Sequence, residues 1–290
     1  MIYTNMEHLQ KQGIADHLRS YCERYGSQNK AANSLKGVSA ATISQMLAGN
    51  WELIKDEMWR SVAAQTGLKA DSWQMVEIRD YKIMCTILAD AQSNALVMAV
   101  TGEAGTGKSF AAKRYVTDNR EAYLLSCAEY WNRKMFLSEL LSTMGRDASG
   151  YTVAEMMGEV VRYLKAAEHP LIILDEADKL SDQVLHFFIT LYNQLEDQCG
   201  IVLCATDHLA RRITRGRKLN KKGYKEIYSR MGRRFVELKG LGATDIAAIC
   251  KANGIEEKGF IKEVIDDCEG DLRRVKRKIH AIKKVLLNAD

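Results

Sequence analysis

The sequence predicts an α/β protein in which a five-stranded parallel sheet is flanked by helical segments at both ends of the chain. Three observations lead to this prediction. Apolar runs of strand length alternate with amphipathic helical patterns across residues 95–240, as a parallel sheet with crossover helices requires. A glycine-rich motif separates the first apolar run from a helical pattern. Residues 1–70 and 241–290 carry helical patterns without further strand candidates.

Composition sets the limits of the prediction. The 290 residues are 47% hydrophobic and 27% charged, which is ordinary for a globular protein with two or three domains. No apolar run approaches the ~20 residues of a membrane span, so no membrane partner is expected. The seven cysteines form no C-x-x-C pair, which favours reduced thiols in a cytoplasm. We divide the chain into residues 1–70, a connecting helix or linker over 71–94, a core over 95–240 and a helical lid over 241–290.

The N-terminal segment contains two helical stretches separated by a turn at Gly37. Ser39 would cap the second helix, and Val38, Ile43 and Leu47 would face the core. The pattern resembles the helix-turn-helix domains of phage repressors. That resemblance implies DNA contact by the short polar side chains of the second helix: Thr42, Ser44 and Gln45. A helical bundle that docks another protein remains the alternative.

The core segment offers five strand candidates, each followed by a turn or a helical pattern. They are Leu96–Val100, Tyr123–Ser126, Leu171–Leu174, Ile201–Ala205 and Phe235–Leu238.

A complete phosphate-binding motif, Gly-x-x-x-x-Gly-Lys-Ser, spans residues 102–109. Glycine is needed at Gly102 and Gly107 because backbone N–H groups must approach the phosphates without an intervening Cβ. The motif predicts that Lys108 contacts the β- and γ-phosphates of ATP and that the Ser109 hydroxyl holds Mg²⁺. The expected nucleotide-binding residues are Gly102, Glu103, Ala104, Gly105, Thr106, Gly107, Lys108, Ser109 and Phe110.

An acidic pair ends the third strand candidate. Asp175 is expected to orient the water shell of Mg²⁺, and Glu176 is expected to polarise an attacking water. A chain with the aspartate alone could bind ATP as a static ligand. The glutamate therefore predicts hydrolysis.

The fourth strand candidate is followed by Thr206 and Asp207. A polar residue here would lie between the phosphate loop and the acidic pair, where it can hold the water or the γ-phosphate. We expect Thr206 to do so, with Asp207 as the next candidate. An ordinary polar cap at the end of a strand is the alternative for either residue.

This order of residues resembles the AAA+ ATPases. The resemblance rests on Lys108, Ser109, Asp175, Glu176 and Thr206. Residues 270–273, Gly-Asp-Leu-Arg, also resemble the family's lid motif, which implies that Arg273 senses the phosphate state of the nucleotide. The resemblance further implies an arginine that reaches the γ-phosphate of a neighbouring subunit, and hence an oligomer. The candidates are Arg230, Arg233 and Arg234.

One segment accounts for the net charge of +5. Residues 211–225 contain eight of the 42 Lys and Arg residues and no acid, so the remaining 34 stand against 37 acidic residues. Basic residues without interleaved aromatic residues favour contact with the phosphate backbone of double-stranded DNA. The expected contacts are Arg211, Arg212, Arg215, Arg217, Lys218, Lys221, Lys222 and Lys225. A solvated basic loop is the alternative.

A repressor-like helix-turn-helix joined to a compact AAA+ ATPase resembles the ATP-dependent target-DNA activators of transposition, the family of phage Mu transposition protein B. The resemblance implies largely sequence-nonspecific duplex binding as a helical homo-oligomer. It also implies delivery of that DNA to a DDE-type transposase, and target immunity through ATP hydrolysis. The family further implies a location in the cytoplasm or nucleoid of a bacterial host.

Two other functions remain open on the sequence. A replication initiator or helicase loader uses the same ATPase module on DNA. A transcription regulator would recognise an operator through the helix-turn-helix, and nucleotide would only switch its affinity. The presence of Glu176, and the concentration of positive charge within the ATPase segment, favour the transposition activator.

Overall fold

The computed structural model describes residues 8–67 and 73–289. The chain divides into two compact units, Met1–Gln74 and Met75–Asp290. Each unit buries its own apolar residues, so each is described by itself.

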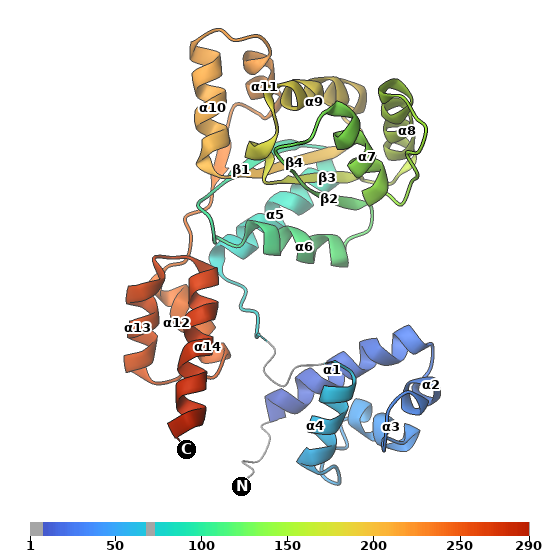
Figure 1. The fold of residues 1–290 in the computed structure, drawn as a ribbon, viewed down its shortest axis with the longest axis vertical. Coiled ribbons are helices and arrows are strands. Elements are labelled where there is room, and N and C mark those ends of the chain that lie inside the picture. The colour runs from blue at the N-terminus through green and yellow to red at the C-terminus, as the bar shows by residue number, and fades with distance from the viewer. Residues whose placement is uncertain (1–7, 68–72, 290) are drawn as a thin grey trace. The chain divides into compact units, whose positions relative to one another are not determined.

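The first unit contains four helices: α1 (His8–Tyr25), α2 (Gln28–Asn33), α3 (Ala40–Ala48) and α4 (Asp56–Gln65) (Figure 1). Its core is filled by side chains from all four, including Leu18, Ala31, Ile43 and Trp59. Burial of these apolar side chains is the main favourable contribution to the stability of such a small helical unit.

The turn between α2 and α3 follows the local rules expected from the sequence. Ser39 lies at the N-cap of α3, and its hydroxyl accepts a hydrogen bond from the Thr42 N–H at 3.1 Å. Met46 is fully buried, whereas Leu47 is only partly buried. Because α3 begins at Ala40, a helix places Met46 on the same face as Ile43. Leu47 packs against the same core, as expected, although it is less completely buried than Met46.

The proposed DNA-reading side chains of α3 differ in exposure. Ser44 and Gln45 are exposed. Thr42 is half-buried, and its hydroxyl lies 2.9 Å from that of Ser39. The assignment of these residues to DNA contact stays a prediction.

The second unit is built around a five-stranded parallel sheet, which confirms the predicted fold class. Its strands are β1 (Val97–Thr101), β2 (Ala122–Ser126), β3 (Leu171–Asp175), β4 (Gly200–Ala205) and β5 (Phe235–Glu237). They lie in the order β2-β3-β4-β1-β5. Every pairing is parallel, so the carboxyl ends of all five strands lie at one edge.

Helices cover both faces of the sheet (Figure 1). One face packs against α5 (Arg79–Asn94) and α6 (Lys108–Asp118), and the opposite face packs against α7 (Arg133–Thr143), α8 (Val153–Ala166) and α9 (Asp182–Leu195). Strand β3 shows the expected alternation. Its Ile173 side chain joins the α5–α6 face, and its Leu174 side chain joins the other.

Helix α5 falls within the segment that the sequence suggested as a connector. In the structure it is part of the helical layer on the sheet, with Met84, Leu88 and Ala91 buried in the core. The apolar face of α5 packs on β4 and α6, so residues 79–94 belong to the second unit and not to a connector.

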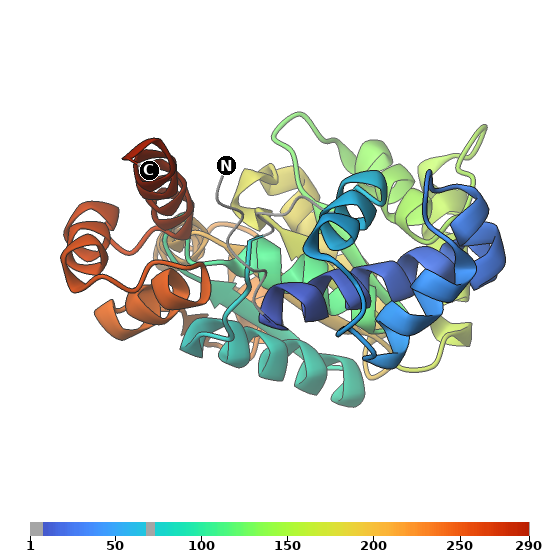
Figure 2. The ribbon, with the colours of Figure 1, turned by 90° about the horizontal axis from the view of Figure 1, so that it is seen from below.

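Two further groups of helices complete the second unit. Helices α10 (Asp207–Lys218) and α11 (Tyr224–Arg230) form a hairpin after β4. Helices α12 (Ala243–Ala252), α13 (Lys258–Cys268) and α14 (Leu272–Ala289) form the C-terminal group (Figure 2). A short 3₁₀ turn, Ala177–Lys179, follows β3. None of the described helices is long and apolar enough to cross a membrane.

We predict that Trp59→Ala lowers the free energy of unfolding of the first unit by about 3–5 kcal/mol, because it leaves a cavity at a fully buried position. Within the described chain the indole Nε1 of Trp59 has no hydrogen-bond partner. Trp59→Phe should therefore cost clearly less. Urea denaturation followed by circular dichroism measures both variants. Equal losses in the two would contradict the prediction.

Candidate functional site

The sheet brings three functional segments to one edge. The phosphate-binding loop follows β1, Asp175 ends β3, and Thr206 follows β4. Strand β4 lies between β1 and β3 in the sheet. Thr206 is therefore placed between the loop and the acidic pair, where ligands bind in open α/β sheets.

A cavity of about 340 Å³ opens at this edge. Most of the predicted nucleotide-site residues line it: Ala104, Gly105, Thr106, Gly107, Lys108, Ser109, Phe110, Asp175, Glu176, Thr206 and Arg273. The sequence analysis missed further lining residues, among them Lys113, Asp178, Lys179 and Leu272. Gly102 and Glu103 were also predicted but are not among the lining residues; their backbone carbonyl oxygens accept hydrogen bonds from Lys108.

Lys108 begins α6 and is held by the loop itself. Its ammonium donates to the carbonyl oxygens of Gly102 at 2.6 Å and Glu103 at 2.9 Å, and to the Thr106 hydroxyl at 3.2 Å. Burial lowers the pKa of Lys108, and the nearby acidic groups, Asp175 and Asp178 among them, oppose that shift. A bound phosphate would favour the charged form in the same way.

The acidic pair at the end of β3 has one buried and one exposed member. Asp175 is buried, and its Oδ1 accepts a hydrogen bond from the Glu176 N–H at 3.0 Å. Glu176 is exposed and has a left-handed backbone conformation with φ 55°, an uncommon conformation that points to a functional role. Its carboxylate forms an ion pair with Lys179 at 2.7 Å.

Asp178 holds Thr206 in place. Its two carboxylate oxygens accept hydrogen bonds from the Thr206 N–H at 3.2 Å and from the Thr206 hydroxyl at 3.1 Å. The Thr206 hydroxyl donates to this carboxylate and lines the cavity as expected, and its contact with a water or the γ-phosphate stays a prediction. The run Asp-Glu-Ala-Asp at 175–178 was the sequence signal for this residue. Asp207 does not line the cavity and is ion-paired with Arg211 at 2.5 Å.

The residues expected to hold Mg²⁺ fit that ion. Ser109 and Asp175 line the same cavity beside Lys108. Mg²⁺ prefers oxygen ligands and retains several waters, so one hydroxyl and one carboxylate acting through water are an adequate protein contribution. The burial of Asp175 in an otherwise apolar strand is explained by such a ligand and by its bond to the Glu176 N–H.

The N-terminus of α14 contacts the phosphate loop directly. The Leu272 N–H donates to the Gly105 carbonyl at 3.1 Å. A Cβ on Gly105 would overlap the Asp271 carboxylate, and Gly105 has φ +85°. Arg273, predicted to sense the nucleotide, is exposed and lines the cavity from this helix. The C-terminal helices thus reach the loop through the motif that the sequence singled out.

The three candidate arginines for a neighbouring subunit are placed differently. Arg230 lies over the Tyr192 ring at 4.8 Å and is ion-paired with Glu196 and Glu226, each at 3.6 Å. Arg233 and Arg234 are exposed, and neither forms an ion pair within the described chain. Arg230 is therefore the least free of the three to reach another subunit, although the sequence analysis included it.

The basic segment forms most of the α10–α11 hairpin. Six of its predicted DNA contacts are exposed: Arg211, Arg215, Lys218, Lys221, Lys222 and Lys225. Arg217 is half-buried and lies over the Tyr228 ring at 4.0 Å. The role of these basic residues in DNA contact stays a prediction.

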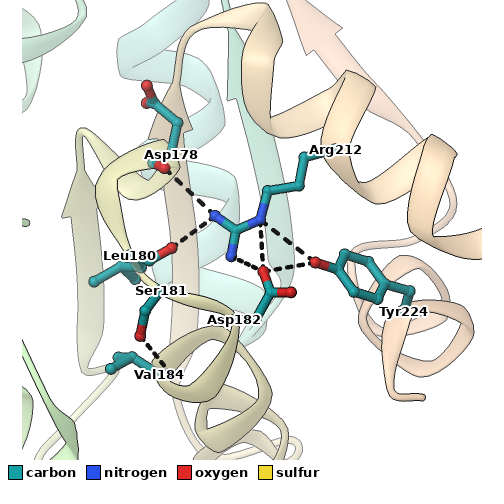
Figure 3. A network of polar contacts seen from close by, with 7 residues as sticks. All are labelled: Asp178, Leu180, Ser181, Asp182, Val184, Arg212 and Tyr224. Atoms are coloured by element: carbon teal, nitrogen blue, oxygen red, sulfur yellow. Dashed lines mark hydrogen bonds and ion pairs between the residues drawn. The ribbon is translucent and has the colours of Figure 1, made fainter. Parts of the chain in front are cut away.

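Arg212 requires a correction. Its guanidinium donates to the Leu180 carbonyl at 2.6 Å and through Nε to Asp182 at 2.9 Å, and a second ion pair joins Nη2 to the same carboxylate (Figure 3). The Tyr224 hydroxyl donates to Asp182 as well, at 2.7 Å. Sequence charge alone suggested a DNA contact. The structure instead commits this side chain to joining α10, α11 and the start of α9.

The fold and the cavity define an AAA-type P-loop domain. Residues 91–213 match the family model described as "AAA domain". Two solved structures share the fold. The chain aligns with Cdc6p of Pyrobaculum aerophilum with a TM-score of 0.50 and 17% identity, covering 72% of this chain and 62% of that one. It aligns with the ORC1 protein of Aeropyrum pernix in complex with DNA with a TM-score of 0.51 and 14% identity, covering 71% and 59%.

Within that class the chain is similar to phage proteins named ATP-dependent target DNA activator B. It is 24% identical to that protein of Escherichia phage Mu over 260 residues, which cover 85% of this chain and 80% of the phage protein. The same values hold for the protein of Escherichia phage D108. The predicted resemblance to the transposition activators is confirmed.

We predict that Gly105→Ala separates α14 from the phosphate loop, because the new Cβ would overlap Asp271 and the left-handed backbone costs about 1–2 kcal/mol. Hydrogen exchange at the Leu272 amide should accelerate. Asp271→Ala in the same background should restore only part of the protection, because the backbone strain remains. Unchanged exchange in Gly105→Ala would contradict this contact.

Proposed function

We propose that this chain is an ATP-dependent AAA+ ATPase that binds duplex DNA largely without sequence preference and oligomerises on it. In this proposal it captures target DNA for a DDE transposase, and ATP hydrolysis governs its release and thereby target immunity. It would act in the cytoplasm or nucleoid of a bacterial host. The similarity to the phage target DNA activators over most of both chains supports the proposal.

The cavity at the edge of the sheet is the observation that carries the enzymatic part. It gathers, from separate elements, a phosphate-loop lysine, a serine hydroxyl, a buried aspartate, an exposed glutamate and a lid arginine: Lys108, Ser109, Asp175, Glu176 and Arg273. Each is of the type that phosphoryl transfer to water requires. A phosphate-binding loop without an acidic pair would support binding only.

The proposed reaction assigns a role to each side chain. Lys108 neutralises charge on the β- and γ-phosphates, while Glu176 accepts a proton from the attacking water. The bond between the γ-phosphorus and the bridging oxygen breaks, which releases ADP and phosphate. Mg²⁺ held by Ser109 and, through water, by Asp175 would supply further charge neutralisation. Lys179 is paired with Glu176 through Oε2, so Oε1 is the oxygen that would accept the proton.

Oligomerisation would complete the site. An arginine from a neighbouring subunit would contact the γ-phosphate, so assembly would depend on ATP and would weaken after cleavage. Many phosphate contacts along a filament give binding that is tight but reversible. The exposed arginines Arg233 and Arg234 are the better candidates because Arg230 is already engaged.

Electron microscopy on long duplex DNA of arbitrary sequence tests the proposal. Continuous filaments with ATP that disappear with ADP would support it. Single complexes at one locus that are indifferent to nucleotide would instead favour a regulator acting through the N-terminal helices.

We predict that Lys108→Ala abolishes nucleotide-dependent DNA binding, because the loop loses the cation that contacts the phosphates.

Glu176→Gln should bind ATP and DNA but form complexes that persist in ATP, because the proton acceptor is lost. Filter binding and phosphate release measure both variants. DNA binding by Lys108→Ala that still responds to ATP would refute the coupling.

We predict that Arg233→Ala lowers DNA-stimulated ATP hydrolysis by about a thousandfold, the scale of a lost arginine finger. A mixture of Arg233→Ala with Lys108→Ala should recover activity, because some interfaces then combine an intact loop with an intact arginine. Arg234→Ala serves as the matched exposed control. Arg234→Ala should keep its activity, and a lack of recovery in the mixture of Arg233→Ala with Lys108→Ala would exclude Arg233 as the finger.

A further inference from the structure

The α10–α11 hairpin contains a second hollow, of about 520 Å³, which shares no lining residue with the nucleotide cavity. Four basic side chains line it: Arg211, Arg212, Arg215 and Lys221. Asp182 is the only carboxylate among its lining residues. The lining is therefore mainly positive. Its basic side chains come from two turns of α10 and from the loop that follows this helix.

Arg212 and Asp182 form one wall of this hollow and neutralise each other. The guanidinium is held by the Leu180 carbonyl and by the Asp182 carboxylate, and Tyr224 donates to the same carboxylate (Figure 3). Burial would raise the pKa of Asp182, but the hydrogen bonds from Tyr224 and Arg212 outweigh it and lower the pKa. Asp182 therefore stays ionised, and its carboxylate accepts hydrogen bonds from Arg212 and Tyr224.

The close approach of α10 and α11 depends on Gly216. A Cβ on this residue would overlap the Tyr224 ring, so a residue with a side chain would force the helices apart. Glycine inside a helix costs about 1 kcal/mol relative to alanine. The helix accepts this cost, and Tyr224 in turn reaches Asp182. The hollow is thus a built feature of the hairpin and not an accidental gap between flexible side chains.

The remaining basic groups are not neutralised within the hollow. Arg215 and Lys221 are exposed, and neither forms an ion pair in the described residues. Arg211 is paired only with Asp207, at the outer surface, where its side chain is 66% exposed. Three like charges line the same hollow, and they repel one another unless an anion lies between them. A guanidinium fork matches the geometry of a phosphate group.

We propose that this hollow binds a phosphate group of the DNA backbone through Arg211, Arg215 and Lys221, with Arg212 as a positioning residue that does not touch the DNA. The inference rests on the proposed function and narrows it, because it divides the basic segment into residues that hold the phosphate and residues that do not. A phosphate contact carries no sequence information, so binding through this hollow has no sequence preference.

The test compares two double variants that remove equal charge from the same segment. Arg215→Gln with Lys221→Gln changes the hollow, whereas Lys222→Gln with Lys225→Gln changes exposed residues outside it. Affinity for an arbitrary duplex is measured over a range of salt concentrations. Each lost phosphate contact reduces the slope of log K against log salt by about 0.9. The hollow holds one phosphate, so the hollow pair should reduce the slope by about 0.9, and the outer pair should leave it nearly unchanged.

Other outcomes are equally informative. Equal reductions in both pairs would overturn the hollow but leave the basic segment as the DNA interface. No reduction in either pair would overturn the hollow and place the proposed DNA contact elsewhere in the chain. Inorganic phosphate at matched ionic strength separates the two sources of phosphate. Inorganic phosphate could raise the melting temperature of the protein as much as the duplex does. If the variant Arg215→Gln with Lys221→Gln loses that increase, the hollow binds free phosphate and the proposal fails.

Arg212 has its own test. The combined change Arg212→Gln and Asp182→Asn removes the ion pair without leaving a lone carboxylate. A positioning role predicts weaker DNA binding with an unchanged salt slope, because no counterion-releasing contact is lost. A direct contact predicts a slope reduced by about 0.9, which would overturn the assignment.

Discussion

The hydrogen bonds between the Asp178 carboxylate and Thr206 are the constraint on which the rest of the site depends. They join the segment after β3 to the first residue after β4. Two residues upstream of Asp178 lies Glu176, and Thr206 immediately precedes α10. One carboxylate therefore fixes the exposed glutamate and the start of the basic helix relative to each other. A half-buried pair of this kind is costly to break, because each partner would be left unsatisfied.

The same segment continues into the Arg212 network. Leu180 and Asp182 lie just beyond Asp178, and both accept from the Arg212 guanidinium. The nucleotide cavity and the basic hairpin are thus attached to one short stretch of chain, residues 178–182. If residues 178–182 adopted two discrete arrangements, both the nucleotide cavity and the basic hairpin would change with them. A shared element of this kind is the physical requirement for coupling between two sites. The contacts identify the element that such coupling would use.

The sequence predicted the parts of the site that depend on local geometry. The phosphate loop, Asp175 and the five strands were found because each follows from residues adjacent in the chain. The role of Asp178 was missed because its partner, Thr206, is remote in sequence. Arg212 was assigned to DNA from charge alone, and charge does not say which carboxylate a basic side chain meets.

The sequence by itself determined that the chain holds a parallel α/β sheet with a phosphate loop, an acidic strand end and a concentration of positive charge. These features follow from side-chain periodicity and from backbone requirements that act over a few residues. Only the tertiary structure decided which charges are neutralised and which remain available. It pairs Arg212 with Asp182, and it leaves Arg215 and Lys221 exposed. The reason is physical: the fate of a charge depends on the groups within a few ångströms of it, and folding brings those groups together from distant parts of the chain.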